Sequence, residues 1–349
     1  MTHSLRSIVL ATASVLCLGG CIPEEDPVAP YNRGDIQQNT VGMEADYRYQ
    51  VYFDLGTNRA VANTLVTDWD LGFPSADTSM AIRLNGGKIM AAADAGTTDF
   101  EAVLSNYGAA WHYDHPTGNP DSAALGKWWQ HTDGHIESRH RVYIIDRGVN
   151  PAGKKLGYKK LTILDYTDGT YTVRFADLNG SNDATITIHR EADHNIMGLL
   201  LDKTGSVLAP EPPNTIWDIA FTRYTHIFYE PEFTPYSVTG VLLNGNGVSV
   251  AKDSTRDFEQ ITTDLIEQYS FSTTRDAIGY DWKIFYLDKN EYIVNPKMVY
   301  IIRDTEGFYY KLHFTDFYNE QGDKGFPSFE SRTLSRPTFP ASPRQYLRH

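Results

Sequence analysis

The chain has 349 residues and a formal net charge of −13, with 41% apolar and 13% aromatic residues. Such an acidic surface repels polyanions, which excludes nucleic acid and anionic lipid headgroups as partners. The apolar content is sufficient for a packed core, and the 22 tyrosines favour strands, because pleated sheet faces accommodate aromatic side chains.

The first 20 residues have the pattern of a lipoprotein signal peptide. Arg6 is followed by the apolar run Ser7–Leu18, which is too short to span a bilayer. The run ends in Leu18-Gly19-Gly20-Cys21, which resembles a bacterial lipobox. We therefore expect Cys21 to be the lipidation site and the protein to be attached to the membrane through lipid. The alternative is an ordinary signal peptide with a chance cysteine.

Residues 21–44 are expected to form an acidic, proline-containing linker. Glu24, Glu25 and Asp26 follow Cys21 and resemble the acidic tether that directs lipoproteins to the cell surface. This predicts an outer-membrane lipoprotein exposed on the cell surface, with a periplasm-facing orientation left open. A merely solvated linker is the other interpretation. Residues 337–349 are expected to be a C-terminal tail.

Two parts of the chain repeat the same landmarks in the same order. Trp69-Asp70-Leu71-Gly72-Phe73 returns as Trp217-Asp218-Ile219-Ala220-Phe221. Four further pairs follow, namely Asn85-Gly86 and Asn244-Gly245, Asp99–Glu101 and Asp257–Glu259, Val142–Ile145 and Val299–Ile302, and Lys160-Leu161 and Lys311-Leu312. The period is far longer than that of solenoid repeats. We predict a tandem duplication with units at 45–192 and 193–336; a single continuous sandwich built from both halves is the alternative.

Alternation of side-chain character predicts strands at 47–53, 171–175 and 185–189. Turn signals occur at Asn85-Gly86, at Asn244-Gly245 and in the hairpin tip 166–171. A helical spacing of apolar residues occurs once in each unit, at 258–269 and 97–107. The sequence therefore predicts an all-β fold of mainly antiparallel sheets, with one short helix per unit.

The repeated Trp-Asp pair is best explained structurally. A tryptophan anchors a core through its large apolar area, and an aspartate beside it can accept backbone donors at a strand end. A catalytic aspartate would need an acid, base or metal partner, and neither copy has such a partner nearby in the sequence.

The second half resembles the HmuY-like family of surface haem-binding lipoproteins. The resemblance is carried by residues 217–224, 238–244, 280–283, 299–302, 309–317 and 325–330. In the first half it is looser and rests on residues 69–73, 142–145 and 157–161. The resemblance implies an all-β fold with little helix, lipid anchoring, and capture of haem outside the cell for delivery to an outer-membrane TonB-dependent transporter.

The resemblance also implies that axial haem ligands come from the segment between the helix and the last hairpins. In the first unit this segment holds five of the chain's 11 histidines beside three of its six tryptophans. These candidate ligands are His112, His115, His131, His135 and His140. The corresponding segment of the second unit, 270–298, has no histidine, and Met298 is its one soft ligand.

Other interpretations of these residues stay open. The five histidines can simply face water, or they can hold zinc together with Asp114, Asp133 or Glu137. Met298 can be a core residue. The aromatic segment 225–237, which contains His226, is a long hairpin or a lid.

The chain shows no sequence signature of catalysis, neither a zinc-protease motif nor a nucleophile elbow, a phosphate loop or a Cys-x-x-Cys pair. We therefore predict a protein that is not an enzyme and that binds haem or a related porphyrin without chemical turnover. The alternative is a structural or ligand-recruiting surface lipoprotein of the same fold that has lost haem binding.

Overall fold

The structure is a computed structural model that describes residues 34–76 and 78–335. The predicted signal peptide, Cys21, most of the linker and the C-terminal tail lie outside the described residues. Within the described part of the chain, no helix combines the length and the apolar character needed to cross a bilayer.

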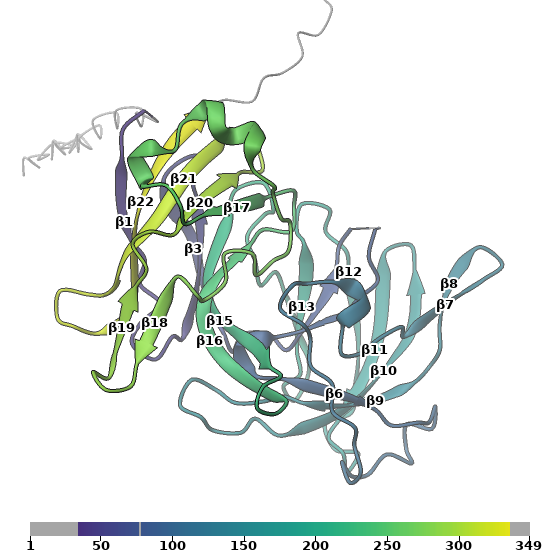
Figure 1. The fold of residues 1–349 in the computed structure, drawn as a ribbon. Coiled ribbons are helices and arrows are strands. Elements are labelled where there is room, and N and C mark those ends of the chain that lie inside the picture. Colours follow the sequence, from purple (N-terminus) through teal and green to yellow (C-terminus); the bar gives the residue numbers. More distant parts are fainter. Residues whose placement is uncertain (1–33, 77, 336–349) are drawn as a thin grey trace, which may run out of the picture. The chain divides into compact units, whose positions relative to one another are not determined.

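The predicted fold class is confirmed, because the described residues form antiparallel sheets with very little helix. Two sheets have five strands each (Figure 1). The first has the order β12 (Ala184–His189), β11 (Thr170–Ala176), β10 (Tyr158–Thr167), β9 (Val142–Asp146) and β6 (Ala91–Asp94). The second has the order β1 (Gln37–Thr40), β22 (Lys324–Ser335), β21 (Tyr309–Tyr318), β20 (Val299–Arg303) and β17 (Ser249–Asp253).

Two sheets have four strands. One has the order β14 (Ser206–Leu208), β13 (Ile196–Leu200), β4 (Leu71–Pro74) and β5 (Arg83–Leu84). The other has the order β16 (Thr234–Leu243), β15 (Ile219–Phe228), β2 (Tyr49–Asp54) and β3 (Arg59–Leu65). Two separate hairpins complete the set, β7 (Trp129–Thr132) with β8 (His135–Ser138), and β18 (Lys283–Tyr286) with β19 (Glu291–Val294).

Strand pairing crosses the predicted boundary between the two units. β2, which lies in the predicted first unit, pairs with β15 of the second. β1 lies in the predicted linker but pairs with β22, so the last part of that linker belongs to a sheet. Conversely, β13 lies in the predicted second unit but pairs with β4 of the first. The sheets thus combine strands from both sequence ranges, and the boundaries at 192 and 193 do not follow the hydrogen bonds.

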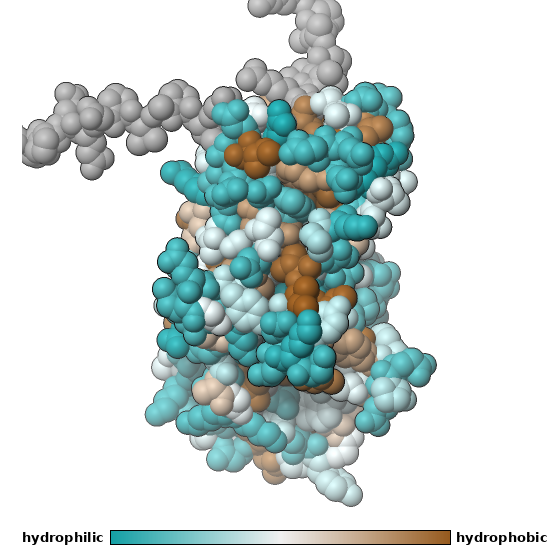
Figure 2. Space-filling model, turned by 60° about the vertical axis from the view of Figure 1, so that its left-hand side comes forward, coloured by the Kyte–Doolittle hydropathy of each residue, from teal (hydrophilic) through white to brown (hydrophobic). Residues whose placement is uncertain are grey.

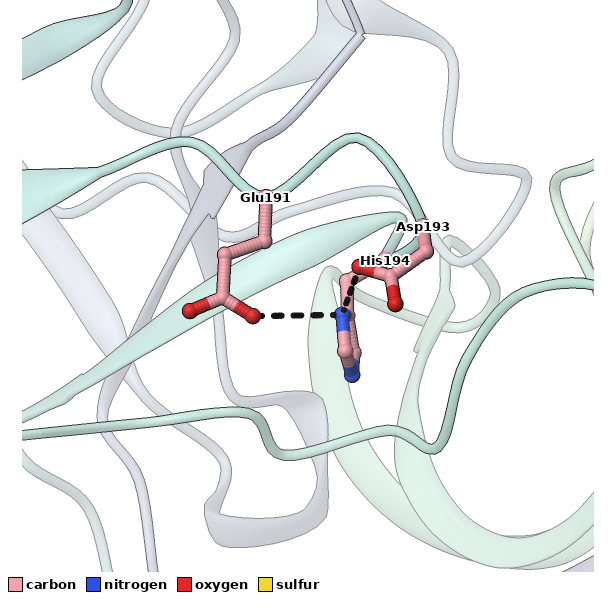
Figure 3. A group of neighbouring side chains, drawn as sticks. All are labelled: Glu191, Asp193 and His194. Carbon is pink, nitrogen blue, oxygen red and sulfur yellow. Dashed lines mark hydrogen bonds and ion pairs between the residues drawn. The ribbon is translucent and has the colours of Figure 1, made fainter.

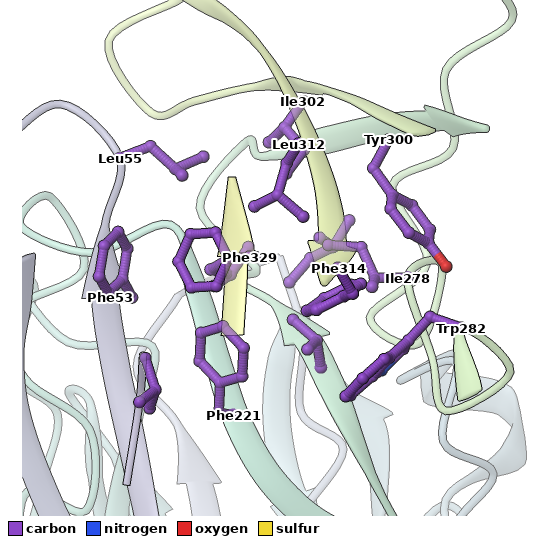
Figure 4. Close-up of a cluster of buried hydrophobic side chains, with 14 of the residues drawn as sticks. Phe53, Leu55, Phe221, Ile278, Trp282, Tyr300, Ile302, Leu312, Phe314 and Phe329 are labelled. Atoms are coloured by element: carbon purple, nitrogen blue, oxygen red, sulfur yellow. The ribbon is translucent and has the colours of Figure 1, made fainter. Parts of the chain in front are cut away.

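Each half has its own apolar core. The core of the C-terminal half lies between its five-stranded sheet and β2, β15 and β16, and Phe221, Phe314 and Phe329 pack together at its centre (Figure 4). The other core contains Phe73, Trp128 and Tyr171. Since both cores are made of alternate residues on the facing sides of two sheets, each half is a β-sandwich in the usual sense.

The two predicted helices differ from expectation. Residues 258–268 form two short 3₁₀ helices, η3 (Phe258–Gln260) and η4 (Thr263–Gln268), and Phe258 is buried against the sheet. Residues 97–107 form turns, and two residues placed on the buried helical face, Leu104 and Tyr107, are exposed. A turn at residues 100–102 is followed by irregular chain at 103–106, so the apolar spacing there does not continue into a helix. The remaining 3₁₀ helices are η1 (Gly86–Lys88) and η2 (Pro120–Ser122).

The turn signals have mixed outcomes. The tip between β10 and β11 is the tight hairpin turn expected, with Asp168 at φ 49° and Gly169 at φ 76°. Asn85, in contrast, does not start a hairpin turn. Its side chain accepts from Gly87 N and caps η1.

The two Trp-Asp segments make equivalent backbone hydrogen bonds. Asp70 N donates to Leu199 O and Asp218 N donates to Phe53 O, both at 2.9 Å. In each half a buried asparagine then holds the tryptophan carbonyl: Asn85 Nδ2 lies 2.9 Å from Trp69 O, and Asn244 Nδ2 lies 2.7 Å from Trp217 O. The structural interpretation of the repeated pair agrees with these contacts.

Candidate ligand-binding site

An aromatic pocket of about 970 Å³ lies in the C-terminal half, between the β15–β16 hairpin, the β18–β19 hairpin and the turn that joins β21 to β22. We call it the aromatic pocket. This volume is at the upper end of the range for small-molecule sites. Seven aromatic side chains line it, namely Tyr47, Phe228, Tyr236, Tyr280, Phe285, Tyr292 and Tyr318.

Close backbone packing positions one wall of the pocket. Val241 and Gly279 exchange backbone hydrogen bonds at 2.9 and 3.1 Å, which brings Tyr280 against β16. A Cβ at Gly240 would lie 2.3 Å from Gly279 O, so only glycine allows this approach. On the opposite wall, Tyr292 N donates to the Tyr318 hydroxyl at 2.7 Å and fastens β19 to β21.

Two lysines line the pocket without a carboxylate partner among the described residues. Lys283 is buried, its Nζ donates to Thr239 O at 2.6 Å, and it lies 4.3 Å from the Trp282 ring centroid. Burial lowers the pKa of Lys283 to about 7, so its charge changes near neutral pH. Lys324 is exposed and lies 5.4 Å from the Tyr47 ring centroid.

The acids of the pocket are engaged elsewhere. Asp281 pairs with Lys252 at 3.2 Å, and Asp323 accepts from Asn319 Nδ2 at 3.2 Å. The Tyr47 hydroxyl, in contrast, is buried and has no hydrogen-bond partner among the described residues. Burial strongly raises the pKa of Tyr47, so its phenol is neutral and can donate a hydrogen bond.

Apolar side chains rim the pocket at the surface. On β18–β19 and the loop between them, Ile284, Phe285, Leu287 and Ile293 are exposed. Tyr229 and Phe233 are exposed at the tip of the β15–β16 hairpin. The face of the molecule shown in Figure 2 is mainly hydrophilic, and its apolar side chains lie in small separate areas. Exposed aromatic and aliphatic residues beside a cavity are typical of a binding surface.

The five predicted histidine ligands do not meet in the aromatic pocket. His115 is half-buried, bonds to Thr117 Oγ1 at 3.0 Å and lines a separate interior cavity. His112, His131, His135 and His140 are exposed and line neither of these two cavities.

Two of these histidines lie on opposite faces of one hairpin. In the β7–β8 register, His131 is opposite Ile136, and His135 is opposite Thr132. Side chains of directly opposed residues share a face, and neighbours along a strand alternate. His131 and His135 therefore leave the ribbon on different sides, and in this arrangement they cannot bind one iron together.

The other ligand candidates lie outside the pocket lining. Met298 is half-buried and packs against the core of the C-terminal half. His226 stacks its ring 4.8 Å from Phe228 and 4.9 Å from Tyr280, both of which line the aromatic pocket. Its Nδ1 is buried without a partner, and burial lowers the pKa of this imidazole. His226 thus stands directly behind the wall of the pocket and is neutral at pH 7.

One group of histidine and carboxylates in the described part of the chain has metal-like spacing, namely Glu191, Asp193 and His194 (Figure 3). His194 Nδ1 lies 2.8 Å from Asp193 and 3.6 Å from Glu191. Both acids are exposed, and these contacts are those of an ordinary surface ion pair. Asp114, Asp133 and Glu137, named as possible zinc ligands, are not part of such a group.

The arrangement suits a flat, aromatic ligand that carries carboxylates. Ring faces supply apolar contact, and the two lysines, which have no carboxylate partner within residues 34–76 and 78–335, supply positive charge for acidic groups. Among the lining residues, the iron ligand type on offer is the tyrosine oxygen, which serves as a haem ligand in some proteins.

Comparison with known proteins places the chain in a family. The family model described as HmuY protein matches residues 46–330. The chain belongs to the HmuY family. Among solved structures, apo PinO from Porphyromonas gingivitis has 10% identity and a TM-score of 0.30, covering 87% of this chain and 99% of that one. The apo HmuY analog of Tannerella forsythia has 10% identity and a TM-score of 0.25, covering 86% and 97%. No curated protein matches the chain.

Sequence reasoning missed the lysines and tyrosines that line the pocket. Tyr280-Asp281-Trp282-Lys283 carries part of the HmuY resemblance, but the motif alone does not indicate a binding site. This motif, Tyr292 and the aromatic segment 225–237 come close in space only when β16, β18 and β19 fold together, so their spacing in the sequence does not predict a common pocket.

Proposed function

We propose that this HmuY-family protein is a surface lipoprotein that captures haem or a related porphyrin in the aromatic pocket. It passes the ligand to an outer-membrane TonB-dependent transporter without chemical turnover. The observation that carries the proposal is a pocket of about 970 Å³ that is lined by seven aromatic side chains and by two lysines without a carboxylate partner in the described part of the chain.

A porphyrin fits this chemistry in two ways. Its macrocycle is flat and apolar, so it packs between tyrosine and phenylalanine rings. Its two propionates are carboxylates, so they pair with Lys283 and Lys324. The side chains that touch the ligand act through packing and charge, and the proposal involves no covalent step.

Iron coordination forms a separate part of the proposal. The pocket lining offers tyrosine hydroxyls, and His226 lies behind the wall formed by Phe228 and Tyr280. The histidine-rich segment of the first half, with His112, His115, His131, His135 and His140, is the alternative source of axial ligands, and Met298 is the alternative in the second half.

Titration of the full-length chain with haemin and with iron-free protoporphyrin IX tests the proposal. We expect both ligands to bind with affinities within about tenfold of each other, because the rings and propionates that carry binding are common to both. Absorbance reports the haemin, and quenching of tryptophan fluorescence reports both. Absence of saturable binding for either porphyrin would refute the function.

A matched pair of tyrosine variants locates the site. Tyr236 lines the pocket and is 59% exposed, whereas Tyr107 is 97% exposed and lies outside the lining, in the other half of the chain. We expect Tyr236→Ala to weaken porphyrin binding about tenfold and Tyr107→Ala to leave it unchanged, since one stacked ring contributes on the order of 1 kcal/mol.

A variant that lacks the five histidines of the first half decides between the two ligand sources. If the aromatic pocket binds the porphyrin, replacement of all five by glutamine leaves both affinities unchanged. Loss of haemin binding, with protoporphyrin binding retained, would assign the iron ligands to the histidine-rich segment.

We also propose that lipidation at Cys21 anchors the protein in the outer membrane, facing the cell exterior. The support is the lipobox-like Leu18-Gly19-Gly20-Cys21 and the acidic residues that follow it. Mass spectrometry of the mature N-terminus tests the lipid, with Cys21→Ala as control, and protease accessibility of whole cells tests the orientation. An unmodified cysteine would refute the anchor.

A tandem duplication is proposed on the repeated hydrogen bonds of the two Trp-Asp segments and on the matching order of the two five-stranded sheets. On this proposal, β1, β2 and β3 complete the sheets of the second copy. A homologous chain that contains one such copy alone and folds would support it.

A further inference from the structure

We propose that the interior cavity is a binding site for a small oxyanion, a carboxylate or tetrahedral anion held by Arg83 and Arg275. This site is separate from the aromatic pocket. The cavity has a volume of about 90 Å³ and lies where β5, the segment after Asp114, β15 and Arg275 meet.

Arg83 is a cation without a partner. It lies on β5 and lines the cavity, and its guanidinium makes no hydrogen bond or ion pair with any described residue. Burial lowers the pKa of Arg83 to about 10, and it remains charged at pH 7. A guanidinium carries five N–H donors in a fixed fork that matches an oxyanion, and those of the half-buried Arg83 remain available to such a ligand.

The nearby carboxylates are already satisfied. The two oxygens of Asp114 accept from Leu84 N and Ala124 N, both at 2.7 Å. Glu211 accepts from Arg275 Nη2 at 3.1 Å and from Asn195 Nδ2 at 3.0 Å. Each carboxylate oxygen therefore has a donor of its own, and none lies within ion-pair distance of Arg83.

Arg275 supplies a second set of donors from the other half of the chain. Only one of its terminal nitrogens is used by Glu211, and its Nε is buried without a partner. The turn at Gly118 packs against its stem, since a Cβ at Gly118 would lie 2.8 Å from Arg275 Cδ. Arg275 N also donates to Thr117 O at 2.9 Å, which fixes the segment that carries His115 beside it.

The size of the cavity restricts the ligand. A dry apolar cavity of 150 Å³ holds benzene, and one water needs only a fraction of this space. A cavity of about 90 Å³ between two arginines accordingly fits acetate, phosphate or sulfate, but not a porphyrin. Part of the histidine-rich segment, including His115, lines this anion site between the halves, and this role does not involve iron.

Calorimetric titration of the full-length chain with sodium phosphate, sodium sulfate and sodium acetate, at constant ionic strength set with sodium chloride, tests the site. We expect saturable binding of at least one anion, and the preferred shape distinguishes a planar carboxylate from a tetrahedral ion. Arg83→Gln should weaken that binding at least tenfold. Arg59→Gln, which removes an exposed arginine of β3, should leave it unchanged.

Thermal unfolding supplies a second readout that a structural role of Arg83 would not produce. In chloride alone, Arg83→Gln should melt at the same temperature as the wild type or higher, because it removes a half-buried charge that has no ion-pair partner among the described residues. The wild type, but not the variant, should gain stability as the anion concentration rises. If no anion binds saturably, or if Arg83→Gln binds as tightly as the wild type, the cavity holds water only and the proposal is overturned.

Discussion

Asp70 and Asp218 occupy equivalent places in the two halves, yet their carboxylates have different neighbours. Asp70 pairs with the buried Lys88 and with Arg147, whose Nη2 lies 3.0 Å away. Asp218 has no cation partner among the described residues. It accepts from Leu55 N at 2.8 Å and Thr305 N at 3.3 Å, and Asp304 lies near it.

The difference shows that a repeated backbone does not fix the charge of a repeated side chain. Burial, with a smaller contribution from Asp304, raises the pKa of Asp218 to about 8, so this carboxyl is protonated at neutral pH. The aspartate of the Trp-Asp segment is therefore part of an ion pair in one half and a neutral hydrogen-bonding group in the other.

The largest effect is expected for Asp70→Asn. The substitution leaves Lys88, which is fully buried, without its carboxylate. Breaking a buried ion pair from one side costs about 3–5 kcal/mol of unfolding free energy. Urea denaturation monitored by tryptophan fluorescence measures this loss. A loss below 1 kcal/mol would mean that Lys88 finds another partner and that the two aspartates are equivalent after all.

The next largest losses of stability are expected for Asn85→Ala and Asn244→Ala, which test whether the two asparagines have the same structural role. Each asparagine binds the carbonyl of its tryptophan and one further backbone carbonyl, Val66 O or Asn214 O. Leaving buried carbonyls without donors should cost about 2 kcal/mol in each variant. If the losses of unfolding free energy in the two variants differ by more than about 1 kcal/mol, the two segments are not equivalent.

Asp218→Asn should be mild and dependent on pH. The pKa of Asp218 is raised on folding, so its contribution to stability is fully present below about pH 4 and is lost as the pH rises toward 8. The asparagine lacks this titration. We expect the variant to be within about 1 kcal/mol of the wild type at pH 5 and to gain on it by about 1 kcal/mol for each pH unit from 5 to 8. A constant difference across this range would show that Asp218 is ionised throughout.

The smallest effect concerns the two buried lysines. Lys88 is paired with a carboxylate, whereas Lys283 has no carboxylate partner among the described residues. Because the pKa of Lys283 is lowered to about 7, its ammonium is lost between pH 6 and 8. Affinity for protoporphyrin should then fall by up to about tenfold over this range. Lys283→Met should remove the dependence, and Lys289→Met, on the same hairpin but outside the pocket lining, should retain it.

The sequence was sufficient for the fold class because alternation and turn residues are local signals. Strands at 171–175 and 185–189 lie within β11 and β12, and the tip at Asp168-Gly169 has the turn expected. The partners of those strands could not be predicted, because pairing depends on residues far apart in the chain. The exchange of β2 and β13 between the expected units is of this kind.

The candidate site was predicted in part. Family resemblance and aromatic content pointed to a porphyrin-type ligand, but residue type led to the histidines rather than to Lys283 or Tyr292. The sequence does not reveal side-chain exposure, because exposure follows from tertiary packing: His131 and His135 are exposed on the β7–β8 hairpin, whereas Lys283 is buried among aromatic rings. The helical spacing at 97–107 failed for the same reason, since Leu104 meets no opposing surface.

The position of β1 has a consequence for biogenesis. Gln38 bonds to Glu330, 292 positions away, so a strand that is synthesised early stays without its partner until nearly the entire polypeptide is made. Until then the edge of β1 is open to pairing with a neighbouring chain. Truncation of β22 would leave β1 without its sheet neighbour, and we expect it to promote aggregation.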